Sequence, residues 1–92
     1  MTTSIEAVST IRAQLHATLA DPLVSQSPAL VHLLSEQARR FSYPGDYGKM
    51  MRHLQGLLAR YQLTTDTVPP AVTTLATMLM RQLRGYDMLL NH

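Results

Sequence analysis

Four segments of helical hydrophobic periodicity, separated by proline and glycine, most constrain what this chain can fold into. In the first segment Ile5, Val8, Ile11, Leu15 and Leu19 recur every three to four residues, the spacing that places side chains on one face of an α-helix. The other three segments repeat this spacing. The pattern predicts helices over residues 3–20, 28–42, 46–62 and 69–90.

The predicted helix ends rest on residues with known capping roles. Asp21-Pro22 ends the first helix, because the residue before a proline is pushed out of the helical region. Ser27-Pro28 begins the second helix with an N-cap residue followed by proline at the first helical position. The remaining signals are the capping-box spacing from Thr3 to Glu6, Asp46 before the third helix and Pro69-Pro70 before the fourth.

The short connections between these segments favour antiparallel packing of consecutive helices. We therefore predict an all-α fold, a small four-helix bundle with antiparallel neighbours. An alternative is a three-helix core with one displaced helix. A chain of 92 residues without a long linker indicates a single domain over residues 1–92.

The composition argues against disulfides, metal sites and most kinds of catalytic site. The chain has no cysteine, so disulfides and thiolate metal sites are excluded, and its four histidines stand in separate segments without the i, i+4 spacing of a helical zinc site. It also lacks a glycine-rich phosphate loop and a cluster of paired carboxylates. We expect no enzyme activity, cofactor, metal or small-molecule substrate.

The sequence also carries no membrane signal. No apolar run approaches the roughly 20 residues needed to span a bilayer. Glu6 and Arg12 interrupt any apolar stretch that would resemble a secretory signal peptide. We expect a cytoplasmic protein that does not bind membranes.

The second and fourth predicted helices carry more apolar side chains than one packed face requires. An apolar stripe about 100° wide suffices for a helix packed on one side. The apolar side chains within residues 75–80 cover a wider arc of the helix surface than this. Methionine suits an adaptable interface because its side chain is flexible and polarizable. The predicted partner-binding residues are Val31, Leu33, Leu75, Met78, Leu79 and Met80. The alternative is a central helix that the rest of the bundle surrounds.

The turn between the second and third helices brings aromatic and basic residues together. We predict that Arg39, Arg40, Tyr43 and Tyr47 form a polar and aromatic rim, since tyrosine and arginine are enriched among interface hot spots. The alternative is that Tyr43 and Tyr47 join Phe41 in closing the end of the core.

Basic residues concentrate in residues 39–60, where five lysine and arginine residues stand against one carboxylate, Asp46. This block supports a second hypothesis, a helix-turn-helix-type regulator that binds nucleic acid. Its contacts would be Arg39, Arg40, Lys49, Arg52 and His53. The alternative is that these residues lie on two antiparallel helices and that their arginines are simply exposed to solvent.

The sequence thus favours a non-enzymatic, adaptor- or chaperone-like module. It would bind a protein partner, or a second copy of itself, through an apolar leucine and methionine helix face.

Overall fold

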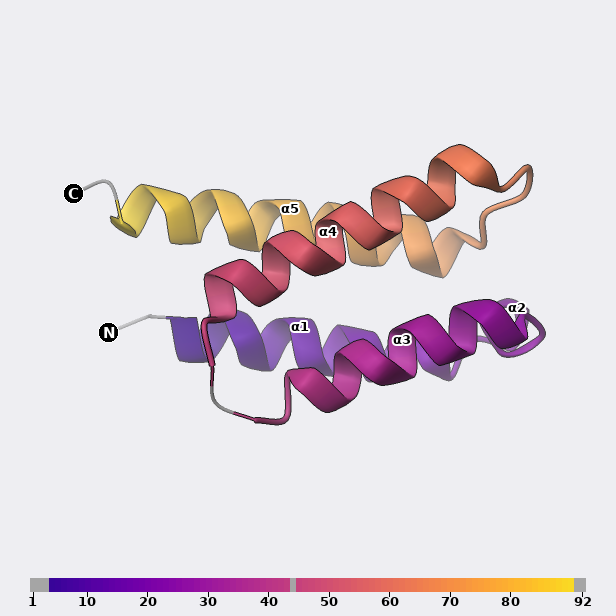
Figure 1. Ribbon diagram of the computed structural model, residues 1–92, viewed down its shortest axis with the longest axis horizontal. Coiled ribbons are helices and arrows are strands. Elements are labelled where there is room, and N and C mark those ends of the chain that lie inside the picture. Colours follow the sequence, from indigo (N-terminus) through magenta and orange to yellow (C-terminus); the bar gives the residue numbers. More distant parts are fainter. Residues whose placement is uncertain (1–3, 44, 91–92) are drawn as a thin grey trace.

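The computed structural model is all-α. It describes the backbone of residues 4–43 and 45–90, and the side chains of residues 8–43 and 45–85. Its helices are α1 (Ser4–Leu19), α2 (Pro22–Ser25), α3 (Pro28–Arg40), α4 (Tyr47–Thr64) and α5 (Pro70–Leu90). The predicted helical bundle is confirmed, with the four long helices running alternately in opposite directions (Figure 1).

The one-turn helix α2 was not predicted. Asp21 and Pro22 do end α1, but the Asp21 carboxylate also accepts hydrogen bonds from the backbone amides of Leu23 (2.9 Å) and Val24 (3.3 Å). Pro22 occupies the first turn of α2, where its missing N–H costs nothing. The same dipeptide therefore stops one helix and starts the next, and it places Val24 in the core.

Two other helix starts follow their predicted caps. The Ser27 hydroxyl accepts from the Leu30 amide at 3.4 Å, and the Asp46 carboxylate accepts from the Lys49 amide at 3.1 Å. α3 ends at Arg40, two residues before its predicted end, and α4 continues two residues further than predicted, to Thr64. The capping-box side chains of Thr3 and Glu6 lie outside the described residues.

The four long helices are not packed equally. α1 packs most extensively against α5 and also against α3, while α4 packs mainly against α5. α3 and α4 follow each other in sequence, yet they diverge from their shared turn instead of packing along their lengths (Figure 1). The antiparallel pairs that hold the bundle together are therefore α1 with α5, α1 with α3, and α4 with α5.

The core is mainly aliphatic, with one aromatic side chain, Phe41, among its described residues, and it draws on every helix. Among the described side chains, the fully buried large residues are Phe41, Ile11, Leu15, Leu30, Leu34, Met51, Leu54, Leu58, Leu75, Leu79, Val24 and Val72. In α4, Met51 is fully buried whereas Met50 is only partly so. The apolar residues at the end of α5, Tyr86, Leu89 and Leu90, lie beyond the described side chains.

Candidate functional site

The predicted partner-binding residues do not form one exposed face. Leu75 and Leu79 are 0% exposed and lie in the core, so they are not available to a partner in this fold. Val31 and Leu33 on α3 are partly buried. Met78 packs partly against the core, and Met80 is 49% exposed.

The reason is that α5 has a neighbouring helix on two sides, α1 and α4. A helix flanked twice needs a wider apolar stripe than a helix packed once. Much of the apolar excess of residues 75–80 is therefore used inside the bundle, as in the alternative considered from the sequence. Of the predicted residues on α5, Met78 and Met80 remain at least partly accessible.

The predicted rim is also divided. Arg39 is exposed and pairs with Glu36, with its Nη2 at 3.0 Å from Oε1 and 2.9 Å from Oε2. Arg40 is exposed, Tyr43 is 64% exposed, and Tyr47 packs partly against the core. Phe41 is fully buried, so it closes the end of the core as the alternative proposed. These residues belong to the end of α3, the turn after it and the first residue of α4, whereas Met78 belongs to the α1–α5 pair.

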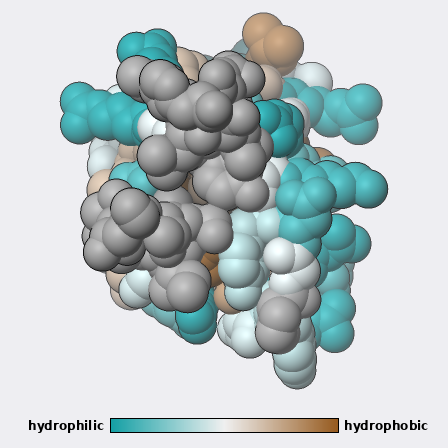
Figure 2. Space-filling view, turned by 90° about the vertical axis from the view of Figure 1, so that its left-hand side faces the viewer, coloured by the Kyte–Doolittle hydropathy of each residue, from teal (hydrophilic) through white to brown (hydrophobic). Residues whose placement is uncertain are grey.

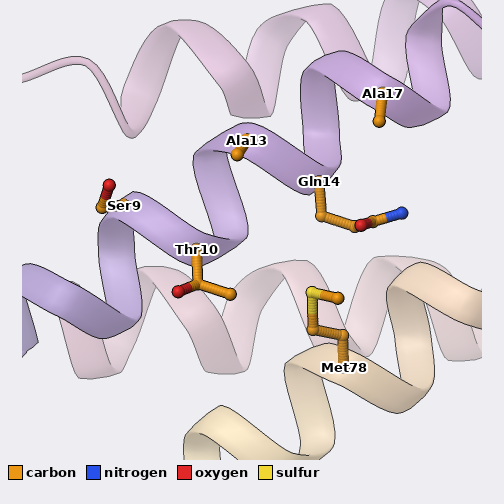
Figure 3. Close-up of a pocket in the computed structure, with 6 residues that line it drawn as sticks. All are labelled: Ser9, Thr10, Ala13, Gln14, Ala17 and Met78. Carbon is orange, nitrogen blue, oxygen red and sulfur yellow. The ribbon is translucent and has the colours of Figure 1, made fainter.

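A shallow groove of about 630 Å³ runs between α1 and α5. It is lined by Ser9, Thr10, Ala13, Gln14 and Ala17 of α1 and by Met78 of α5. Thr10 and Gln14 extend from α1 toward Met78, which extends from α5 toward α1 (Figure 3). The groove thus combines one methionine with small or uncharged side chains.

Sequence reasoning missed the α1 side of this groove, although its signal was readable. Ser9, Ala13 and Ala17 are spaced at i, i+4 and i+8, so they form a row along one side of α1. All three are exposed. The exposed side of a surface helix usually carries charged or long polar residues. Because small side chains occupy these positions, this strip of the α1 surface is uncharged and lies close to the helix backbone.

A second depression, of about 220 Å³, lies at the turn between α3 and α4. It is lined by Arg40, Asp46, Lys49, Met50 and His53. The structure thus brings together three of the predicted nucleic-acid contacts. Arg39, a fourth, is held by Glu36.

Within the described part of the chain, no group of three or more His, Asp or Glu residues is placed to hold a metal ion. Nor does that part contain a helix whose length and apolarity would allow it to cross a membrane.

Comparisons of the chain with protein-family models, curated proteins and solved structures give no match.

Proposed function

We propose that this chain is a non-enzymatic protein–protein interaction module that receives a helical segment of its partner in the α1–α5 groove. The observation that carries the proposal is the groove itself, which a row of small exposed α1 side chains lines together with Met78. An adaptor- or chaperone-like role in the cytoplasm is consistent with such a surface.

The dimensions and chemistry of the groove suit a helix. Ser9 and Ala17 are eight residues apart, so the row extends about 12 Å, or roughly two helical turns. Small side chains let two helix backbones approach closely, and Met78 can adjust its rotamer to an irregular partner surface. Amphipathic helices commonly bind in grooves of this kind through apolar residues spaced three and four apart.

The decisive experiment fills the groove without disturbing the core. Because Ala13 is exposed, Ala13→Arg adds a long charged side chain to the groove and removes no buried contact. Ala59→Arg is the matched control, since Ala59 is also an exposed helical alanine but lies on α4. Each variant would be purified gently from the source cells and its assembly measured by native mass spectrometry.

We expect the parent chain and Ala59→Arg to retain a partner at fixed stoichiometry, and Ala13→Arg to lose it. A mass that is a multiple of 10.3 kDa would identify the partner helix as belonging to a second copy of this chain. An additional polypeptide would identify a hetero-complex. If Ala13→Arg keeps its partner with unchanged affinity, the groove is not the binding site and the proposal fails.

Met78 and Met80 offer a second test. Met78→Glu would place a carboxylate in the groove, whereas Met80, which does not line it, is the exposed methionine next along α5. For the double variant with Met80→Glu we expect dissociation with nearly unchanged helical content by circular dichroism. Met78 packs partly against the core, so a moderate loss of stability is also expected. Unfolding of the double variant would instead assign both residues to the core.

A further inference from the structure

We infer that the exposed face of α4, together with Arg40, binds the phosphate backbone of a nucleic acid. This second surface is separate from the α1–α5 groove and does not depend on the function proposed for it. The argument starts from the charge of α4, which contains one lysine, two arginines and one histidine between Tyr47 and Thr64 and no acidic residue.

The helix places these charges on its solvent side. Lys49, His53 and Arg60 are separated by four and seven residues, the spacing of one helix face, and all three are exposed. Arg52 is exposed beside them. Lys49 and Arg60 are eleven residues apart, which corresponds to about 16 Å along the axis. Because one DNA strand carries a phosphate about every 3.4 Å of duplex, this face spans several phosphates.

Arg40 extends the charged face across the turn from α3. It lines the same depression as Lys49 and His53, so two helices contribute cationic side chains to one concave surface. Asp46 also lines the depression, but its Oδ1 accepts the Lys49 amide and caps α4. Hydrophilic side chains gather on the side of the molecule that carries α3 and α4, at the right of Figure 2.

These cations are available to an external anion. Among the described side chains, Arg40, Lys49 and Arg60 have no carboxylate within ion-pair distance, whereas Arg39 is paired with Glu36. Arginine and lysine without internal partners are the groups that neutralise phosphates and release their counterions.

The centre of this α4 face carries no side chain that would hold a ligand away from the backbone. Gly56 is exposed, and a Cβ added there would meet no atom within 4 Å. A phosphate strand can therefore lie close to the α4 backbone between Lys49 and Arg60. Since α3 and α4 diverge and do not form a compact helix-turn-helix, we assign contacts to phosphates and not to base edges.

The test is fluorescence anisotropy with a labelled 20-base-pair DNA duplex at several salt concentrations. Three phosphate contacts, from Arg40, Lys49 and Arg60, predict a slope of about −2.7 for log K against log salt, hence about 40-fold weaker binding at 200 mM than at 50 mM salt. Lys49→Glu with Arg60→Glu should weaken binding at 50 mM salt by at least about tenfold and flatten that slope.

The matched control is Arg81→Glu with Arg84→Glu, which changes the net charge equally but at exposed positions of α5. It should lose less than about threefold in affinity, because these arginines lie off the face.

Equal losses in the two double variants would mean nonspecific charge attraction and would overturn the inference, as would no binding by the parent chain at 50 mM salt. If the charge reversal prevents folding, Lys49→Gln with Arg60→Gln replaces it. Equally tight binding of polyglutamate would overturn the inference in favour of an acidic protein partner.

Discussion

The burial of Leu79 beside the exposure of Met80 gives a sharp test of how α5 is oriented. The two residues are adjacent in one helix, yet Leu79 is 0% exposed and Met80 is 49% exposed. Truncating each to alanine removes a side chain of similar size from the core in one case and from the surface in the other. Comparing the two variants therefore distinguishes the effect of lost core packing on stability from the effect of changed helix propensity.

The expected magnitudes differ widely. A buried leucine truncated to alanine costs about 2 to 5 kcal/mol, because transfer energy is lost and a cavity remains. At about 0.05 to 0.15 kcal/mol per residue, a 92-residue chain has roughly 5 to 14 kcal/mol of total stability. Leu79→Ala should therefore lower the melting temperature by roughly 10 to 30 °C. Met80→Ala should change the free energy of unfolding by less than about 1 kcal/mol.

Thermal and urea unfolding, both followed by circular dichroism at 222 nm, give the melting temperature and the free energy of unfolding of both variants, since the chain has no tryptophan to serve as a fluorescence probe. The measurement should be repeated at two protein concentrations. If Leu79 contributed to an interface between chains, its truncation would instead change the concentration dependence of the melting temperature. A loss below about 1 kcal/mol for Leu79→Ala, with a larger loss for Met80→Ala, would refute the assigned orientation of α5.

Three further substitutions test local features by the same unfolding assay. Gln37 is 4% exposed and its Oε1 has no hydrogen-bond partner among the described residues. Gln37→Met should therefore stabilise the fold by about 1 to 3 kcal/mol. A loss of stability would show that the oxygen has a hydrogen-bond partner in the folded protein. Gly56→Ala should stabilise α4 by up to about 1 kcal/mol, because the added methyl group meets no atom within 4 Å; destabilisation would reveal a hidden close contact. Asp46→Ala should cost about 1 kcal/mol by removing the cap on the Lys49 amide, and an unchanged midpoint would mean that the cap contributes nothing.

Local signals predicted most of the fold. Ser27, Asp46 and Pro70 mark helix starts through hydrogen bonds and dihedral angles that involve only neighbouring residues. The prediction failed at Asp21-Pro22 because a stop signal and a start signal coincide there, and the Asp21 cap together with the burial of Val24 stabilises the extra turn.

The candidate site was predicted less well, because its geometry depends on distant residues. Whether Leu75 and Leu79 face a partner or the core depends on which helices flank α5, and α1 is supplied from the other end of the chain. The exposed row of Ser9, Ala13 and Ala17 is local and could have been read from the sequence. Its position opposite Met78 could not, since that requires the α1–α5 pairing.

The dominance of the α1–α5 pair has a consequence for how the protein is made. Helical domains usually fold fast because their contacts are local, but here the first helix has its most extensive packing with the last one. During synthesis α1 can pack only against the earlier helices α2 and α3 until almost the whole chain has left the ribosome. The part of its apolar surface that α5 covers in the finished bundle therefore stays exposed to solvent for most of translation.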